Sequence, residues 1–307
     1  MKNQQKKYHG IIPPVVTPLF GQDTLDRNGL GKLVEHILSG GVHGLFILGT
    51  TGEGPSLSYD LRYEVTGRVC SQVDGRVPVL VGITDTSFTE SIRLSTKAAD
   101  VGADAVVAAP PYYFSSKQSE LINYFRSLAD ESPLPLFLYN MPSHTKVHFE
   151  PETVKALANH SNIIGFKDSS GDLLYFQNVV RLLQDHTEFS LLVGPEEMLM
   201  QSVLTGGHGG VNGGANMFPK LYVAMYEAAL EKDFERMSSL QGKIHQISSS
   251  LYTVGNSPAK YLQGLKCALS LMGICKDTLA LPYSSFGDEE RKMIEKSLKN
   301  LDLEEVS

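Results

Sequence analysis

The sequence predicts an α/β fold in which eight strands alternate with helices. Short apolar runs rich in Val, Ile, Leu or Phe recur along the first 230 residues, each bounded by Gly or Pro. Such runs are typical of strands buried on both faces. Between the runs, the apolar spacing changes to the period of an amphipathic helix. An open doubly wound sheet is the alternative, but the Gly-rich phosphate turn expected after its first strand is missing. The pattern therefore favours a closed (β/α)8 barrel of the TIM type.

Each expected element has its own local signal. Ser87 followed by Glu90 is a capping-box pattern and predicts the start of the third helix. Gly40 and Gly41 are expected to end the first helix. The strand runs begin near Ile11, Leu45, Val79, Ala105, Leu136, Ile163, Leu191 and Gly210. The first four helices are marked by Leu30, Leu33, Val34, Ile37 and Leu38, by Leu61, Val65 and Val69, by Ile92, Leu94, Ala98 and Ala99, and by Leu121, Ile122, Phe125 and Leu128. The next three are marked by Val154 and Leu157, by Val179, Val180, Leu182 and Leu183, and by residues 198–204.

The last part of the chain is predicted to be helical. No strand run of comparable quality follows residue 230, and residues 232–252, 258–273 and 288–302 have helical spacing. Ser257 and Pro258 are expected to open the middle helix as an N-cap and a first-turn proline. We therefore expect a catalytic (β/α)8 barrel over 1–230 and a C-terminal three-helix extension over 231–307.

Composition excludes several classes of function. The chain has 27 basic and 34 acidic residues and a net charge of −7, so no global field attracts nucleic acid or an acidic membrane surface. The 3 cysteines cannot all pair and form no C-x-x-C, which favours a reducing compartment. Prolines at 13, 14 and 18 interrupt the apolar stretch behind the basic residues 1–7, and no run is long enough for a membrane helix. We expect a cytoplasmic protein.

Barrel enzymes place their site at the C-terminal ends of the strands, and Lys167 is the most informative residue there. Side chains alternate along a strand, so Lys167 and Gly165 are expected to share one face. Ile164 and Phe166 would then face the helices, which directs Lys167 into the barrel mouth. Burial there lowers the pKa of an amine, and a neutral amine can form a Schiff base with a ketone. The alternative is a solvated lysine.

The expected strand ends together supply the candidate site residues. They are Thr17, residues 49–53, 110–113, 139–142, 167–169 and 194–196, and Asn216 with the glycines before it.

Two neighbouring strand ends carry further candidates. Tyr139 ends the fifth strand, where its hydroxyl is expected to reach the same cavity and relay protons. A core tyrosine with a satisfied hydroxyl is the alternative. The turn Gly49-Thr50-Thr51-Gly52-Glu53 offers backbone N–H groups and two hydroxyls that can hold a small carboxylate or phosphate. A tight strand-to-helix turn explains the same residues.

Two other segments were considered as phosphate or metal sites, and neither gives a specific signal. The glycines of residues 206–214 suit either a phosphate site or close backbone packing, and no Lys or Arg lies between His186 and Phe218. His144 and His148 follow Pro142 in an expected loop, and the chain has no H-E-x-x-H motif and no P-loop. We predict no metal and no cofactor beyond a covalent lysine imine.

Four motifs occur in order at the expected strand ends. They are Gly49-Thr50-Thr51-Gly52-Glu53, Pro111-Tyr112-Tyr113, Leu138-Tyr139-Asn140-Met141-Pro142 and Gly165-Phe166-Lys167-Asp168. With them the chain resembles the dihydrodipicolinate synthase / N-acetylneuraminate lyase family of Schiff-base barrel enzymes, essentially from end to end.

The resemblance implies a role for each matching residue and an oligomer. Lys167 matches the Schiff-base lysine and Tyr139 the tyrosine that moves protons at the imine. Thr50 matches the hydroxyl that links this tyrosine to a second one, and Tyr113 matches that second tyrosine, which in the synthases comes from a neighbouring subunit. The family is usually a homotetramer built as a dimer of dimers. Thr51 matches the residue that holds the pyruvyl carboxylate, and Val211 lies where a backbone carbonyl faces the substrate.

One position departs from the dipicolinate branch. There an arginine that grips aspartate semialdehyde follows the Tyr-Asn-x-Pro-Ser pattern, whereas here Ser143 is followed by His144. Residues 167–172, Lys-Asp-Ser-Ser-Gly-Asp, look more like branches that cleave or dehydrate 2-keto-3-deoxy acids. The sialic acid lyases usually carry Ser-Thr where Thr50 and Thr51 stand, which disfavours that substrate.

The expected function is a Schiff-base lyase or aldolase acting on pyruvate and an aldehyde, or on a 2-keto-3-deoxy acid. A true dihydrodipicolinate synthase, which condenses pyruvate with aspartate semialdehyde, is the first alternative. A non-catalytic keto-acid sensor is the second. The sequence names neither the aldehyde nor the direction of the reaction.

Overall fold

The strands form one parallel sheet that curls into a barrel. In the computed structural model, which describes residues 7–301, hydrogen bonds order the strands β1-β10-β9-β8-β7-β6-β5-β4. Backbone bonds from Val15 to Phe46 and from Phe46 to Pro13 connect the chain after β1 to β4, so the two ends of the sheet meet. This arrangement agrees with the TIM barrel predicted from the sequence. The strands are β1 (Gly10–Ile11), β4 (Leu45–Ile47), β5 (Val79–Gly82), β6 (Ala105–Ala108), β7 (Leu136–Asn140), β8 (Ile163–Asp168), β9 (Ser190–Val193) and β10 (Gly209–Gly210).

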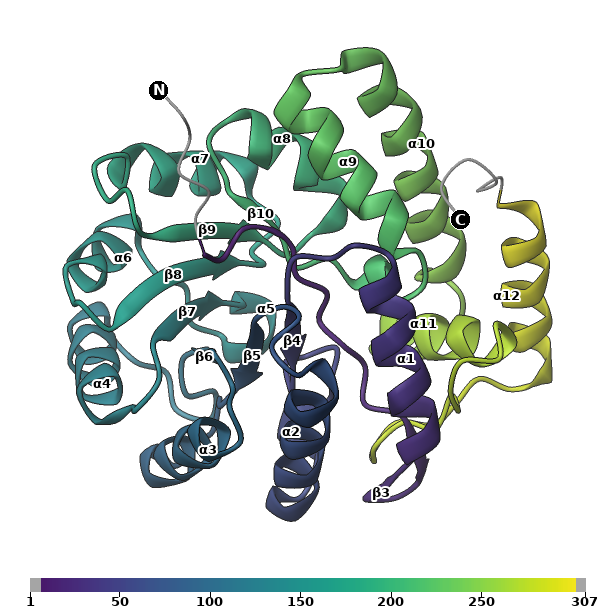
Figure 1. The fold of residues 1–307 in the computed structure, drawn as a ribbon, viewed down its shortest axis with the longest axis horizontal. Helices are drawn as coiled ribbons and strands as arrows, with labels where there is room; N and C mark the ends of the chain where they lie inside the picture. The colour runs from purple at the N-terminus through teal and green to yellow at the C-terminus, as the bar shows by residue number, and fades with distance from the viewer. Residues whose placement is uncertain (1–6, 302–307) are drawn as a thin grey trace.

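Helices surround the strands, as Figure 1 shows. Those that follow the barrel strands are α1 (Arg27–Ser39), α2 (Tyr59–Val73), α3 (Phe88–Asp100), α4 (Gln118–Glu131), α5 (Pro142–Thr145), α6 (Pro151–Ala158), α7 (Leu173–Leu182), α8 (Leu199–Leu204) and α9 (Pro219–Glu231). Short 3₁₀ turns are η1 (Gly54–Ser56), η2 (Glu196–Met198) and η3 (Gly213–Asn216). No helix among residues 7–301 is long and apolar enough to cross a membrane.

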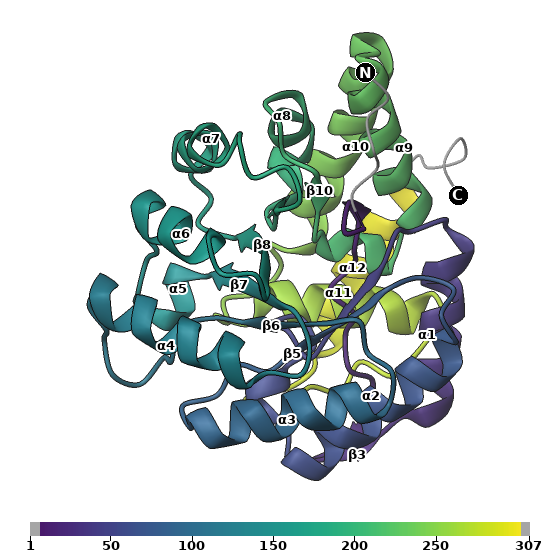
Figure 2. The ribbon, with the colours of Figure 1, turned by 60° about the vertical axis from the view of Figure 1, so that its left-hand side comes forward.

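The C-terminal part packs against the barrel rather than standing apart. Its helices are α10 (Phe234–Leu251), α11 (Lys260–Leu271) and α12 (Asp288–Asn300). α11 and α12 pack against each other, and both contact α10 (Figures 1 and 2). α10 contacts α9 and α11 contacts η3, so the segment is in contact with elements of the barrel. Residues 1–6 and 302–307, which include most of the basic N-terminus and the last expected helical residue, lie outside the described residues.

The structure corrects two local predictions and adds one element that was not expected. The middle C-terminal helix begins at Lys260, not at Pro258, because the Ser257 hydroxyl accepts the Ala259 N–H in a turn before the helix. His144 lies in α5, a single helical turn, and not in a loop. A hairpin of β2 (Leu19–Gly21) and β3 (Thr24–Leu25), which was not expected, precedes α1. The Ser87 side chain does accept the Glu90 N–H, which confirms the predicted start of α3.

Two apolar clusters separate the inside of the barrel from the helix layer. The inner cluster contains Phe46, Phe137 and Leu192, and Phe166 belongs to the larger cluster beneath the helices. On β8, a Cβ on Gly165 would lie 2.1 Å from the Phe137 ring, so Gly165 faces inward as predicted. Ile164 is an exception, because it packs against the inner cluster. The β7–β8 register shifts between Leu136 and Phe137, and this irregularity breaks the strict alternation that the prediction assumed.

Candidate active site

Lys167 lies inside the barrel mouth and is buried. Only 5% of its surface is exposed, and Nζ lies 4.0 Å from the centre of the Tyr139 ring and 4.8 Å from that of Phe46. The two residues come together because Tyr139 of β7 is in register with Lys167 of β8. Burial lowers the pKa of the Lys167 amine, and a hydrogen bond with Tyr139 opposes this shift. The site therefore favours a neutral amine more strongly than water does.

Tyr139 connects the lysine to the turn after β4. Its hydroxyl lies 3.3 Å from the hydroxyl of Thr50, with either oxygen able to donate. Lys167, Tyr139 and Thr50 thus form a continuous polar path through an otherwise apolar barrel end. Such a path can move a proton to or from a group bound at the lysine.

Tight backbone packing shapes the turn of residues 49–53. Leu48 and Glu53, on either side of the glycines and threonines, both have left-handed backbone with φ of 58° and 55°. A Cβ on Gly54 would lie 2.1 Å from the Leu48 carbonyl oxygen, which explains why a glycine follows Glu53. The Thr17 hydroxyl donates to the Gly52 carbonyl at 2.7 Å. Non-glycine residues in this region are strained, and neighbouring contacts must hold them there.

Two cavities meet at this turn. One, of about 340 Å³, is lined by Thr51, Lys167 and Val211, and the other, of about 460 Å³, by Phe46 and Tyr112. Thr50 and Tyr139 line both and stand between them. The Thr51 hydroxyl lies 3.3 Å from that of Tyr261 on α11. The smaller cavity can therefore offer the amine, hydroxyls and a backbone wall to one small molecule.

The matches to known proteins agree with this site. The model of the Dihydrodipicolinate synthetase family matches residues 7–301. The chain belongs to this family. Members are class I lyases, and this chain is accordingly an enzyme of the lyase class.

Relatives within the dihydrodipicolinate synthetase family have more than one name. A 4-hydroxy-tetrahydrodipicolinate synthase of Methanocaldococcus jannaschii is 35% identical over 96% of this chain and 99% of its own. A probable 2-dehydro-3-deoxy-D-pentonate aldolase of Escherichia coli is 32% identical over 94% of this chain and 95% of its own. The shared fold and the family are shown, whereas the names of the relatives disagree on the substrate.

Solved structures of the family superpose closely. The structure of dihydrodipicolinate synthase from Bacteroides thetaiotaomicron is 55% identical, has a TM-score of 0.94, and matches 98% of this chain and 100% of its own. YagE of Escherichia coli, described as a member of the family in complex with pyruvate, is 32% identical with a TM-score of 0.90, covering 96% and 99% of the two chains.

Tyr113 lies apart from the other predicted residues of the family site. It is 80% exposed, its ring packs edge-on against Phe114 at 5.0 Å, and it lines neither cavity. Phe114 is 79% exposed. Within the described chain, Tyr113 has no route to Tyr139 through Thr50, so its predicted role would require a second subunit.

His144 lines both cavities from α5. Its Nδ1 lies 2.9 Å from the Ser143 hydroxyl, and burial together with the nearby Lys146 lowers the pKa of its imidazole. The Lys146 amine turns away and donates to the Ser143 carbonyl at 2.7 Å. At this edge of the site the chain therefore offers a neutral ring.

Glu196 is a feature of the site that sequence reasoning placed only at a strand end. Its carboxyl group accepts the Tyr222 hydroxyl at 2.6 Å and the Gly214 N–H at 2.8 Å. Burial raises the pKa of Glu196 to about 7, and these two hydrogen bonds limit the rise. The residue also lines the smaller cavity, so a carboxyl that changes charge near neutral pH belongs to the same cavity wall as Lys167.

The glycine-rich segment now has a structural explanation. A Cβ on Gly209 would lie 2.0 Å from the Gly10 carbonyl, and one on Gly214 would lie 1.9 Å from the Tyr222 hydroxyl. Close packing therefore accounts for glycine at these positions, and a phosphate site is not needed to explain them. Residues 7–301 contain no group of three or more His, Cys, Asp or Glu side chains arranged to hold a metal ion.

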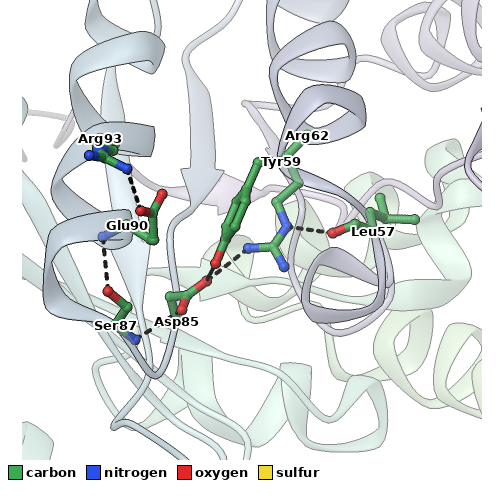
Figure 3. A network of polar contacts seen from close by, with 7 residues as sticks. All are labelled: Leu57, Tyr59, Arg62, Asp85, Ser87, Glu90 and Arg93. Atoms are coloured by element: carbon green, nitrogen blue, oxygen red, sulfur yellow. Dashed lines mark hydrogen bonds and ion pairs between the residues drawn. The ribbon is translucent and has the colours of Figure 1, made fainter.

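A buried ion pair supports the wall of the larger cavity and was not anticipated. Figure 3 shows Arg62 between the Leu57 carbonyl, at 3.1 Å, and Asp85, at 3.2 Å. Tyr59 donates its hydroxyl to the same carboxylate at 3.1 Å. Because Asp85 follows β5 and Arg62 lies on α2, the pair joins two units of the barrel next to Tyr112. Burial and the Asp85 carboxylate raise the pKa of Tyr112.

Proposed function

We propose that the chain is a Schiff-base lyase or aldolase that acts on pyruvate and an aldehyde, or on a 2-keto-3-deoxy acid. The observation that carries the proposal is the buried Lys167 amine beside the Tyr139 ring, with the Tyr139 hydroxyl 3.3 Å from that of Thr50. A buried amine of lowered pKa is a nucleophile for ketones, and an adjacent hydroxyl pair can serve the proton transfers.

The proposed reaction begins when Lys167 Nζ attacks the C2 carbonyl of the keto acid. The carbinolamine takes up a proton through Tyr139, loses water and becomes the imine. In the cleavage direction, the C3–C4 bond breaks, its electron pair enters the enamine, and the C4 hydroxyl loses its proton to give the aldehyde. The enamine then takes a proton at C3, and water releases pyruvate from the lysine. Condensation is the reverse sequence.

The substrate carboxylate is proposed to lie against the turn of residues 49–53. Thr51 offers a hydroxyl within the smaller cavity, and its partner Tyr261 holds it from the C-terminal segment. Val211 lines the same cavity, and the family resemblance implies that its backbone carbonyl faces the substrate. YagE was solved in complex with pyruvate, which supports pyruvate as the keto acid.

Dihydrodipicolinate synthase is the second candidate. The Bacteroides thetaiotaomicron protein, 55% identical, carries that name, as does the Methanocaldococcus jannaschii relative. Against it stands His144, whose ring offers no permanent positive charge where the dipicolinate branch has arginine. The sensor hypothesis is not carried forward, because the chain belongs to a family of lyases.

We also propose that the chain assembles as a dimer of dimers, with Tyr113 completing the site of a neighbouring subunit. The exposed pair Tyr113 and Phe114 supports an interface at this loop. The barrel over 1–230 and the extension over 231–307 are proposed to act as one catalytic unit, since Tyr261 lines the cavity that Lys167 lines.

Borohydride reduction tests the Schiff base directly. With pyruvate present, the treated protein should gain one reduced pyruvyl group on the peptide that contains Lys167, as measured by mass spectrometry. Lys167→Ala should remain unlabelled and inactive. Lys155→Met, which removes an exposed lysine of α6 that lines neither cavity, is the control and should be labelled like the native chain. Labelling of Lys167→Ala to the native extent would overturn the assignment.

A further inference from the structure

One buried ion pair connects the C-terminal segment to the turn after β4. Lys266 of α11 is fully buried, and its Nζ lies 2.5 Å from Oε1 of Glu53, which is 5% exposed. The Lys266 amine also donates to the Thr278 carbonyl at 2.6 Å. Glu53 uses its other oxygen to accept the Ala280 N–H at 2.8 Å. A buried lysine without a partner is very costly, so this pair is a strong constraint on both segments.

The constraint acts on a backbone that is strained without it. Glu53 ends the turn in left-handed conformation, at φ of 55°, and its N–H donates to the Thr50 carbonyl at 3.0 Å. Thr51, inside that turn, is held by Tyr261 of the same helix that carries Lys266. Tyr261 and Lys266 of α11 therefore both hydrogen-bond to the turn of residues 49–53, which lies more than 200 positions away in the chain.

We propose that Glu53 and Lys266 are positioning residues through which the C-terminal segment sets the turn that receives the carboxylate of the keto acid. Neither side chain carries out the chemistry. Lys266 lines neither cavity, and Glu53 lines only the larger one. The pair acts by fixing the backbone that presents Thr50 and Thr51. This inference rests on the proposed function, because it assumes a keto acid bound between Lys167 and the turn.

The prediction separates positioning from simple stabilisation. Lys266→Met leaves Glu53 buried and unpaired, whereas Lys266→Met with Glu53→Gln removes both charges. Removing both partners of a buried pair costs far less stability than removing one. The double variant should therefore regain most of the melting temperature lost in the single variant. The turn would still lack the short bond to α11, so the pyruvate concentration for half-maximal labelling of Lys167 should stay raised, on the order of tenfold or more.

The experiment measures borohydride labelling of Lys167 by pyruvate in the full chain, alongside melting temperature. Arg291→Met is the matched control, because it breaks an ion pair of the C-terminal segment, to Asp277 at 2.6 Å, that does not contact the turn. It should lower the melting temperature and leave the half-maximal pyruvate concentration unchanged.

The outcomes are distinguishable. A double variant that recovers both melting temperature and native pyruvate dependence would show that the pair only stabilises the fold, and would overturn the inference. A rise in half-maximal pyruvate in Arg291→Met of the same size would overturn it as well. Failure of the native chain to be labelled at all would instead overturn the proposed function, and with it this inference.

Discussion

A buried carboxyl group in the cavity that Lys167 also lines makes stability depend on pH. Burial raises the pKa of Glu196 from 4.5 to about 7 in the folded protein. The folded state therefore holds a proton that the unfolded state releases between these values. The stabilisation from this group is complete below pH 4.5 and is lost as pH rises through about 7.

Glu196→Gln should raise the melting temperature above pH 7 and give no gain near pH 4.5. The glutamine can accept the Gly214 N–H and donate to the Tyr222 hydroxyl, as a protonated glutamate would. One pKa unit corresponds to about 1.4 kcal/mol, so a rise from 4.5 to about 7 corresponds to a gain on the order of 3 kcal/mol. Thermal unfolding followed across this pH range measures it. Glu188→Gln, the same substitution at an exposed position outside this cluster, should keep the native pH dependence.

His144 governs the choice of electrophile in the proposed function. Arginine holds a carboxylate with two charge-assisted hydrogen bonds, whereas the His144 ring is kept neutral by burial and Lys146. His144→Arg should raise kcat/KM for aspartate semialdehyde by roughly one to two decades, because a hydrogen bond to a charged group is worth about 1.5–3 kcal/mol.

Steady-state kinetics of the native chain provide the counter-test. If the native chain already condenses aspartate semialdehyde as well as His144→Arg does, the aldolase preference is wrong and the synthase function stands. Lys146→Met checks the other cation nearby. Since that amine is already bound to the Ser143 carbonyl, its loss should not change the preference.

At the scale of elements, the pairing of β7 and β8 brings the two central residues together. Asn140 and Asp168, the residues after Tyr139 and Lys167, are in register, and the Asn140 amide donates to Asp168 at 2.8 Å. The Asn140 side-chain oxygen Oδ1 accepts the Phe149 N–H at 3.2 Å. These hydrogen bonds of the Asn140 side chain lie immediately behind the site and fix the ends of both strands.

Asn140→Ala should lower both stability and kcat. It leaves the Phe149 N–H without its partner, and an unsatisfied buried group costs about 1–3 kcal/mol. It also removes the Asn140 hydrogen bond to the Asp168 carboxylate, which keeps those from Ser170. Small displacements of reacting groups can cost on the order of 10² in rate. Denaturant unfolding and steady-state kinetics measure the two effects.

Asn162→Ala is the matched control for Asn140→Ala. Its amide binds three carbonyls, including that of Ala129 at 2.8 Å, before β8 begins and at the far end from Lys167. It should lower stability and spare kcat. Equal effects of the two variants on kcat would contradict a specific role for the Asn140 hydrogen bonds.

At the scale of the whole molecule, the exposed Tyr113 is proposed to act in a neighbouring subunit. Lys167→Ala and Tyr113→Phe should each be strongly impaired, since a lost proton-relay group costs on the order of 10²–10⁴ in rate. Mixed dimers should regain one active site each, because the Tyr113→Phe subunit keeps its lysine and receives Tyr113 from its partner. After random exchange, about a quarter of all sites should be active.

A second mixture is the control for subunit exchange. Lys167→Ala with Tyr139→Phe should recover nothing, because those two residues belong to the same site. Absence of recovery in the first mixture, with mixed oligomers demonstrated by native mass spectrometry, would exclude Tyr113 from the shared site.

Strand positions and the direction of most side chains follow from the sequence, because burial on both faces produces recognisable apolar runs. Lys167 and Tyr139 were candidates from their strand ends, and the family resemblance implied the link from Tyr139 to Thr50. The structure brings the three together. Ile164 was assigned to the wrong face because an irregular register is a property of two paired strands. A local run cannot reveal it.

What the tertiary structure alone decided is where distant charges meet. Lys266 stands in an apolar run of α11, which could have signalled a buried lysine in need of an acid, but no spacing identifies Glu53 as that acid. The same holds for Glu196 with Tyr222 and for Arg62 with Asp85. Apolar periodicity is a local pattern, so it can be recognised in the sequence. The pairing of buried polar groups depends on which segments the closed barrel places side by side, and that is decided only when the chain has folded.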